Sequence, residues 1–330
     1  MNNTSMSGHL HKRLLYKSLL PTKNPPGRNR LKKALLLCLA PLVMASCATR
    51  IRIPAELEPE RLLPAGAVAY LRINPVMADE LIFPYIEPYG ITLAADMLER
   101  TESVVLAVMP PFGIPGGQAS KPVVYGVVSG KFPTRSIALK LNTDRHWAKE
   151  GHSWINKEDG FRLALTSRGQ ILVGTAPLDA ITSGGYDKPH PVPEFWSTAW
   201  NNDLAMYLPD PFSFLDNKLP VDASGLPLEA MLISTRRMDD QYVLFLGFEF
   251  AMERSAVVFT PLCRLFVYAL ARSLWPQQAS EILSPVTWST QGSTVEASGL
   301  RLDALQLAGL LALPFGETLQ ARIGQMGGLK

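Results

Sequence analysis

Histidines are the first side chains of this sequence to consider for catalytic or metal-binding chemistry. His146 and His152 flank a polar segment, but their spacing matches neither a helical pair four residues apart nor the ligands of a zinc hairpin. His190 lies between two prolines, and we assign it no role. We therefore expect solvated loops at these positions and no metal site.

Two pairs of neighbouring carboxylates, Glu158-Asp159 and Asp239-Asp240, are the next candidates, because general acid–base catalysis uses such groups. Each pair lies between two strand patterns, and Gly160 completes an Asp-Gly turn signal after the first pair. A catalytic carboxyl needs a desolvated position to raise its pKa, which an exposed turn does not provide. The sequence also lacks a phosphate-binding loop and a Gly-x-Ser-x-Gly elbow. We predict turns here, no cofactor and no enzymatic activity.

The stretch before Cys47 has the order of an export signal. Lys32 and Lys33 precede an apolar run, residues 34–46, that closes on small residues. A secretory signal needs a basic region, an apolar region of roughly 7–15 residues and small residues before the cleavage site, and all three are present. A membrane-spanning helix needs about 20 apolar residues, and this run is shorter and contains Pro41. The stretch therefore predicts export.

The end of this signal, Met44-Ala45-Ser46-Cys47, resembles the lipobox of bacterial lipoproteins. The usual pattern has Leu three residues before the cysteine, and Met44 resembles the relaxed form of spirochaete lipoproteins. The resemblance implies that signal peptidase II cleaves before Cys47, whose thiol and new amino group become acylated. An uncleaved anchor and an ordinary signal peptide are the alternatives. Ala48 is not the Asp that often retains lipoproteins at the inner membrane, so we expect a lipid anchor with the outer membrane favoured.

Processing reverses the charge of the chain. Residues 1–46 hold eight Lys or Arg and no acid, which leaves 24 basic and 29 acidic residues in the mature chain. Its formal net charge is −5, whereas the whole sequence has +3. A nucleic-acid-binding protein needs a basic patch that survives processing, so we exclude that class of partner.

Because the basic region before the signal is unusually long, we expect translation to start at Leu31 rather than at Met1 or Met6; peptides upstream of Leu31 would contradict this.

Cysteine use allows no intramolecular disulfide in the mature chain. Cys38 leaves with the signal, Cys47 is acylated on the prediction above, and Cys263 remains. An exported chain of this length can bury a core without covalent links. Cys263 lies in an apolar stretch, which predicts a buried, inert thiol.

The mature chain is long enough for one large or two ordinary domains, and we favour two. Gly- and Pro-rich residues 182–196 mark the boundary between them, and we place the cut near residue 190. The predicted segments are a precursor signal region (1–46, core 31–46), a Pro-rich lipidated tether (47–66), a first domain (67–190), a second domain (191–316) and a flexible tail (317–330).

Strand and helix patterns follow one another in both domains. The first domain has predicted strands at 67–73, 103–109, 122–128, 154–156, 161–167 and 171–176, with helical patterns within 76–100, at 136–141 and at 177–181. The second has a predicted strand within 203–211, a hairpin around Arg236–Asp240, a helix at Glu253–Trp275, two further strands and a helix within 300–313.

The second domain repeats motifs of the first. Residues 67–75 and 203–211 both have Tyr-Leu near the strand end, and Leu178–Ile181 and Leu302–Leu305 each follow a strand. We predict an α+β fold of two tandem ferredoxin-like (split βαβ) units that arose by internal duplication. The opening of the first domain, Leu63–Pro75, is similar to the first strand of some exported bacterial proteins of unknown function, a likeness that implies no activity.

Glu253–Trp275 is the longest apolar helical pattern of the mature chain and could be a membrane span. Arg264 near its middle and Pro261 argue against spanning, because a central Arg costs roughly 2.5–3.5 kcal/mol on insertion scales. We predict a core helix, with a lipid-facing or partner-binding helix as the alternative.

These observations favour a non-enzymatic lipoprotein, anchored in the bilayer through Cys47, that acts as an interaction or envelope-assembly module with a possible envelope protein as partner. The alternative is a carrier of apolar ligands, which needs a pocket lined by the apolar helices. A third possibility is an unrecognised enzyme, which polar groups clustered in a cleft would favour.

Overall fold

The described part of the protein consists mainly of β-strands. The structure is a computed structural model that describes residues 51–53, 57–75, 99–110, 123–182, 188–215 and 227–312. The strands are β1 (Ala69–Ile73), β2 (Thr101–Met109), β3 (Val123–Gly130), β4 (Trp147–Glu150), β5 (Ser153–Asn156), β6 (Arg162–Leu165), β7 (Ile171–Gly174), β8 (Leu204–Leu208), β9 (Leu228–Met238), β10 (Gln241–Phe250), β11 (Thr287–Gln291) and β12 (Thr294–Leu302).

Short helices connect these strands, and one long helix follows β10. They are η1 (Pro59–Leu62), α5 (Thr134–Thr143), α6 (Asp179–Thr182), η3 (Glu194–Trp196), α7 (Ser197–Trp200), α8 (Pro211–Leu215), α9 (Glu253–Leu274), α10 (Ala279–Leu283) and α11 (Ala304–Ala312). The predicted helix at 136–141, the hairpin around Arg236–Asp240 and the long helix at Glu253–Trp275 are confirmed. Most of the helical pattern within 76–100, the tail 317–330 and the lipobox residues Met44, Ala45, Ser46 and Cys47 lie outside the described residues.

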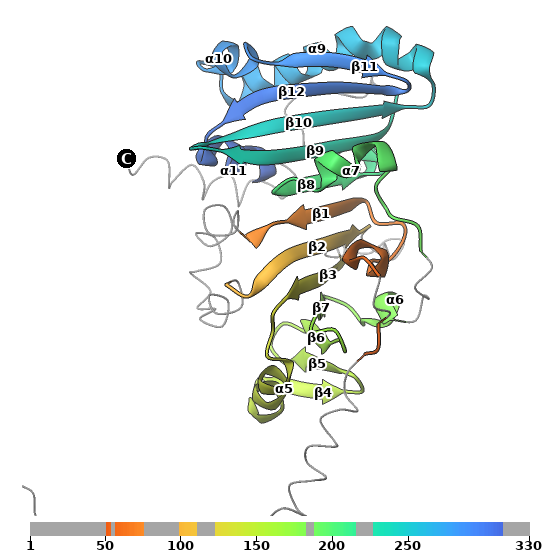
Figure 1. Ribbon diagram of the computed structural model, residues 1–330, viewed down its shortest axis with the longest axis vertical. Helices are drawn as coiled ribbons and strands as arrows, with labels where there is room; N and C mark the ends of the chain where they lie inside the picture. Colours follow the sequence, from red (N-terminus) through yellow and green to blue (C-terminus); the bar gives the residue numbers. More distant parts are fainter. Residues whose placement is uncertain are drawn as a thin grey trace, which may run out of the picture. The chain divides into compact units, whose positions relative to one another are not determined.

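The twelve strands are joined into one sheet, in the order β11-β12-β10-β9-β8-β1-β2-β3-β7-β6-β5-β4 (Figure 1). All pairings between these strands are antiparallel. The α+β class is therefore confirmed. The sheet belongs to the unit Ala48–Lys330.

The strand order repeats on the two sides of the β1–β8 pair. One side runs β1-β2-β3-β7-β6 and the other runs β8-β9-β10-β12-β11, so that corresponding strands occupy corresponding places. Short α6 follows β7 as α11 follows β12. The hairpin of β4 and β5 is an addition to the first side.

The ferredoxin-like plan is not confirmed by this order. In a split βαβ unit, a third strand lies between the first two, whereas β1 pairs directly with β2 and β8 pairs directly with β9. The boundary expected near residue 190 separates two halves of one sheet, because Tyr70 of β1 lies opposite Tyr207 of β8 in the same ladder.

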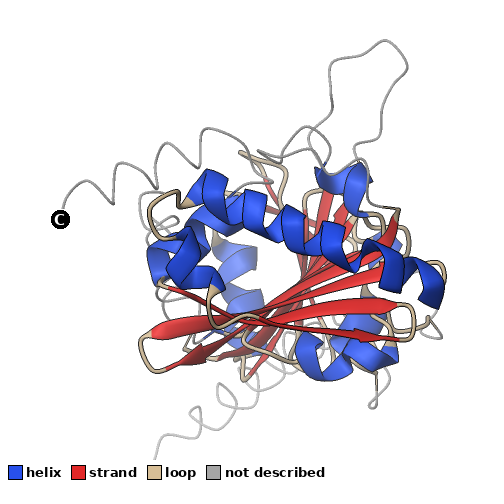
Figure 2. Ribbon diagram, turned by 90° about the horizontal axis from the view of Figure 1, so that it is seen from above, coloured by secondary structure: helices blue, strands red, loops and turns tan. Residues whose placement is uncertain are grey.

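Helices cover both faces of the sheet, as Figure 2 shows. Successive side chains of a strand point to opposite faces, and in β8 Met206 and Leu208 enter the core beneath α9, whereas Ala205 and Tyr207 enter a second core with residues of η1, α6 and α7. A third core forms between α5 and strands β5–β7 and contains the fully buried Trp154.

The segment predicted as a tether, 47–66, is partly buried where it is described. Leu62 and Leu63 are 1% and 3% exposed in the second core, and η1 runs through this segment. The prolines and charges of the segment indicated a solvated spacer, but its two leucines cover the apolar face of the central strands. Near Cys47, only residues 48–50 precede the folded body.

Candidate functional site

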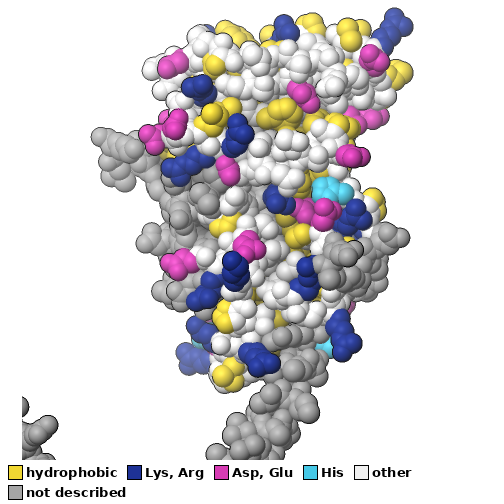
Figure 3. Space-filling view, in the orientation of Figure 1, with side chains coloured by type: hydrophobic (Ala, Val, Ile, Leu, Met, Phe, Trp, Pro, Cys, Tyr) yellow, Lys and Arg dark blue, Asp and Glu magenta, His cyan; other side chains and the backbone are white. Residues whose placement is uncertain are grey.

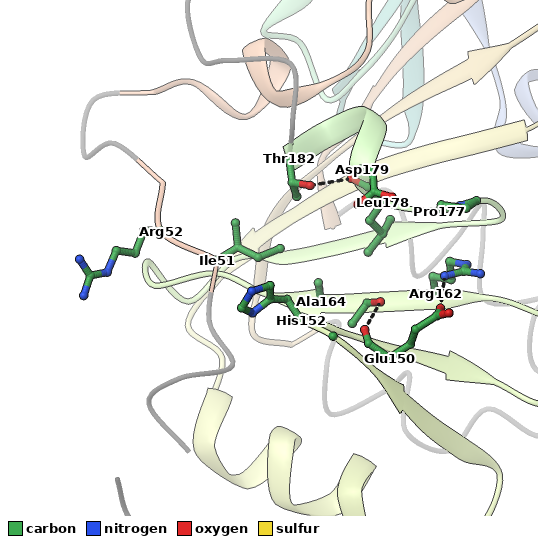
Figure 4. Close-up of a pocket in the computed structure, with 12 residues that line it drawn as sticks. Ile51, Arg52, Glu150, His152, Arg162, Ala164, Pro177, Leu178, Asp179 and Thr182 are labelled. Carbon is green, nitrogen blue, oxygen red and sulfur yellow. Dashed lines mark hydrogen bonds and ion pairs between the residues drawn. The ribbon is translucent and has the colours of Figure 1, made fainter. Parts of the chain in front are cut away.

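A polar cavity of ≈ 690 Å³ lies at the β4–β7 end of the sheet (Figure 4). Two small residues, Ser153 and Ala164, pair across β5 and β6 and belong to its lining. Glu150, His152 and Arg162 line its walls. This is the cleft with clustered polar groups that an enzyme would require.

The groups in this cavity are arranged as structural contacts rather than as a nucleophile and a base. The Ser153 hydroxyl donates to the backbone oxygen of Glu150 at 3.0 Å, so its proton is not directed at His152. Arg162 Nη1 lies 2.6 Å from Glu150 Oε2, an ion pair that closes one wall. Arg52 belongs to the lining, but its side chain extends away from the other labelled residues (Figure 4).

The three histidines of the mature chain lie apart. His146 Nδ1 is 2.7 Å from Glu158 Oε1 at an exposed position, and His152 lines the polar cavity. His190 packs edge-on against Trp200 with ring centroids 6.4 Å apart. Within the described ranges, no group of His, Cys, Asp and Glu side chains is arranged to hold a metal ion.

Both carboxylate pairs form turns, as predicted. Asp159 accepts the backbone N–H of Phe161 at 2.9 Å, and Gly160 adopts a φ of 74° between β5 and β6. Asp239 itself has a φ of 56° at the tight turn between β9 and β10, a conformation that Asp tolerates.

Cys263 is fully buried on the inner face of α9, which confirms the prediction for this residue. Burial raises the pKa of its thiol to about 12, so the protein keeps it in the unreactive protonated form.

A buried ionic group, which the sequence did not reveal, joins η1 to the sheet. Glu60 of η1 is 4% exposed and pairs with Arg72 of β1. Trp200 of α7 donates its indole N–H to the same carboxylate at 3.3 Å. Tyr70 adds a hydrogen bond from its hydroxyl to the backbone oxygen of Pro64 at 2.9 Å. The group fixes the N-terminal segment and the second half of the chain to the same strand.

Residues 51–53, which we call the N-terminal strap, lie along the end of β6. Ile51 donates its N–H to the backbone oxygen of Leu165 at 3.0 Å and accepts the N–H of Ser167 at 2.7 Å, forming a parallel bridge. Ile53 is buried in the second core. The strap therefore fixes the start of the folded body to one end of the sheet.

Helix α9 buries one face and exposes an apolar one. Its inner face contacts β10, β11 and β12, and Cys263, Phe266 and Val267 are buried there. Its outer face, which we define as Val257, Val258, Leu262, Leu265 and Tyr268, is exposed.

From Val258 onward these residues recur every three to four positions, and Val257 lies eleven residues, about three turns, before Tyr268, so all five share one side of the helix. Val258 is 61% and Leu265 59% exposed, values that a soluble core helix does not require. Exposed Arg254 and Arg272 lie near the two ends of this side.

By length and composition, α9 is the one helix within the described residues that is apolar enough to cross a membrane, but one of its faces belongs to the core. Arg264 lies over the ring of Trp288 of β11 at 5.7 Å, so its charge stays at the surface.

A second cavity, of ≈ 430 Å³, lies beside α10 and is lined by polar side chains such as Gln278 and Asp303. Neither this cavity nor the one at β4–β7 is lined by α9. The carrier alternative, which needs a pocket bounded by the apolar helices, remains a prediction.

Comparison with known proteins gives a fold but no family. No protein-family profile matches the sequence, and no curated protein matches it. The crystal form I structure of TP0453 is similar to this chain with a TM-score of 0.56 at 16% identity, covering 79% of this chain and 98% of that one. The chain has the fold of TP0453. Crystal form III of TP0453 agrees, with a TM-score of 0.55 at 15% identity over 78% and 99% of the two chains.

At this level of identity the likeness to TP0453 concerns the fold alone. The Glu60 group, the strap and the outer face of α9 are therefore described for this chain alone.

The helical period of α9 could have revealed two faces from the sequence, but the side that is left uncovered depends on which strands the helix packs against.

Proposed function

We propose that the chain is a lipoprotein, anchored to the bilayer through acylated Cys47, that acts as a non-catalytic interaction module of the bacterial envelope. The observation that carries the proposal is the exposed apolar outer face of α9. Contiguous exposed apolar surface marks an interaction site in soluble domains. The hydroxyl and ion-pair contacts of the β4–β7 cavity support a module without catalysis.

The partner that fits this face is a protein with an apolar groove bordered by carboxylates. Such carboxylates would pair with Arg254 and Arg272, which lie near the two ends of the outer face. A second copy of the chain fits less well, because two antiparallel α9 helices would place Arg254 of one copy opposite Arg272 of the other.

The anchoring bilayer also fits this face less well than a protein does. Nine inter-strand spacings separate β6, which holds the strap, from β11, which lies beside α9. At about 4.8 Å per spacing this is about 43 Å along the sheet, so α9 lies far from the end that leads to Cys47.

The anchor is tested by replacing Cys47 with Ala in cells fed an alkyne-tagged fatty acid. We expect the tag on the native protein and none on the variant, which is released from membranes or left uncleaved. A variant that is still processed and tagged would contradict the assignment.

Changing Ala48 to Asp is expected to shift the protein from the outer to the inner membrane fraction.

The docking surface is tested by incorporating the photo-cross-linker p-benzoylphenylalanine at Leu265 in cells. The matched control is Leu139 on α5, also an exposed leucine on a helix, at 66% against 59%. We expect one discrete envelope protein cross-linked from position 265 and not from 139. Cross-links only to lipid, only to a second copy, or equal patterns at both positions would contradict the proposal.

We also propose that the two halves arose by internal duplication. Support comes from the identical strand order on the two sides of the β1–β8 pair and from the helices α6 and α11, which follow equivalent strands. The duplication concerns this strand order and not a ferredoxin-like unit.

A further inference from the structure

The charge of the mature chain is unevenly distributed. Residues 131–168, which run from the end of β3 through α5 and β4–β6, contain eight Lys or Arg and four Asp or Glu, a formal charge of +4. The mature chain as a whole has −5, so the rest of it carries −9. Figure 3 shows Lys and Arg side chains gathered over the lower part of the view, where β4–β7 lie in Figure 1. We call this region the basic end.

Several of these cations are exposed to solvent. Arg135 and Lys140 project from α5, and Lys149 lies on the edge strand β4 with its amino group 6.0 Å from the Trp154 ring centroid. Within the described part of the chain, β4 is the last strand of the sheet in this direction.

The basic end is also the end to which the strap leads. Ile51 is hydrogen-bonded to Leu165 and Ser167 at the end of β6. Four peptide links separate Ile51 from Cys47, which at about 3.5 Å per residue allows at most about 14 Å. A lipid on Cys47 would therefore hold the basic end at the membrane surface.

We propose that the basic end is the membrane-facing surface of the protein and seats on anionic lipid headgroups. The proposal rests on the lipidation of Cys47 proposed above. The attraction of a Lys or Arg to an anionic leaflet acts over about one Debye length, near 8 Å at physiological ionic strength. The link from Cys47 to Ile51 spans at most about 14 Å, so it holds the end of the sheet that carries these cations beside the leaflet, where they can come within that range. The lipid supplies affinity, and the charges supply orientation.

This orientation has a consequence for the rest of the molecule. The remainder of the chain is acidic, and α9 lies toward the opposite edge of the sheet. The basic end and the outer face of α9 are thus two separate surfaces, one directed at the anchoring membrane and the other away from it.

The test uses the mature lipidated protein in vesicles of phosphatidylcholine, alone or with phosphatidylglycerol. A donor dye is attached to a cysteine placed at Thr143, at the end of α5, or at Ser273, at the end of α9, and the acceptor is on the lipid headgroups. The native Cys263 is buried and does not compete for the dye. We expect energy transfer from position 143 to exceed that from 273 in anionic vesicles, and to fall in neutral vesicles or in high salt.

Removing the charges gives a quantitative test. Changing Arg135, Lys140 and Lys149 to Gln is expected to lower the ratio of protein whose basic end contacts the headgroups to protein whose basic end does not. The expected decrease is about fivefold for each cation, equivalent to about 1 kcal/mol each. The matched control changes three exposed arginines of the other half, Arg236, Arg264 and Arg301, to Gln and should leave transfer unchanged.

The outcomes separate this proposal from the one on which it rests. Protein that fails to float with vesicles overturns the lipidation and this proposal together. Protein that floats but gives transfer independent of lipid charge, or responds equally to both sets of substitutions, overturns this proposal alone. Binding of the basic end to an oligonucleotide in preference to anionic vesicles would also overturn it.

Discussion

Replacing Arg72 with Ala removes the cation that pairs with the buried carboxylate of Glu60. Glu60 is 4% exposed and the Arg72 side chain 25%, so the pair is largely shielded from water. Once Arg72 is gone, the indole N–H of Trp200, 3.3 Å away, is the side-chain donor that remains to this carboxylate within the described residues. One neutral donor does not replace a guanidinium, so the variant leaves an uncompensated charge in the second core.

The expected loss follows from the cost of breaking a buried ion pair, about 3–5 kcal/mol when one partner is removed. The hydrogen bond from Trp200 places the expected value near the lower limit, about 3 kcal/mol. With a urea slope of about 3 kcal/mol/M, the unfolding midpoint should fall by about 1 M. This is a large part of the roughly 5–15 kcal/mol that stabilises an ordinary protein.

The assay is urea unfolding monitored by tryptophan fluorescence at neutral pH, with Arg61→Ala as the matched control. Arg61 pairs with Glu58 at 3.3 Å on the same segment, but both side chains are exposed, at 41% and 58%. An exposed pair contributes about 0–1 kcal/mol, so the control should shift the midpoint by no more than about 0.3 M.

A second variant separates the buried charge from lost packing. Adding Glu60→Gln to Arg72→Ala removes the uncompensated charge while keeping an acceptor for Trp200, so at least half of the lost stability should return. Equal midpoints for Arg72→Ala and Arg61→Ala, or no recovery in the double variant, would refute the reasoning.

Three further substitutions or measurements test other parts of the structure. Burial, with the Glu229 charge nearby, raises the pKa of Glu249. The folded protein therefore binds this proton more tightly than the unfolded chain does, and its stability falls as the pH rises through the raised pKa. In thermal unfolding, Glu249→Gln should stabilise the protein at about pH 7 but not below about pH 4. Gly247→Ala would place a Cβ 2.6 Å from the Trp196 ring and should cost about 1–3 kcal/mol of unfolding free energy in urea titration. The Cys263 thiol, with a pKa raised to about 12 by burial, should resist a thiol reagent at pH 8 in the native protein and react once urea unfolds it; fast native reaction would contradict its burial.

Local patterns predicted the elements of this protein well. Alternation in residues 161–167 matched β6, the Asp-Gly signal matched the turn at Gly160, and the apolar helical period matched α9. These features depend on neighbours within a few residues, where side-chain direction is set by the backbone period.

The arrangement of the halves could not be read in the same way. The repeat of strand order was visible as repeated motifs, but the direct pairing of β1 with β2 and with β8 depends on contacts between residues over 30 and over 130 positions apart. Sequence periodicity carries no register between such segments, so two units were predicted where one sheet forms.

What the sequence by itself determined is the α+β class, the order of the elements as two successions of strands and helices, and the apolar stretch that buries Cys263. The export signal that ends at Cys47, and with it the mature charge of −5, stay predictions from the sequence. Only the tertiary structure decided that Leu62 and Leu63 belong to the core, that Glu60 is buried beside Arg72, and that the outer face of α9 is uncovered. The physical reason is that burial is a property of distant surfaces brought together, and no stretch of chain specifies alone what will cover it.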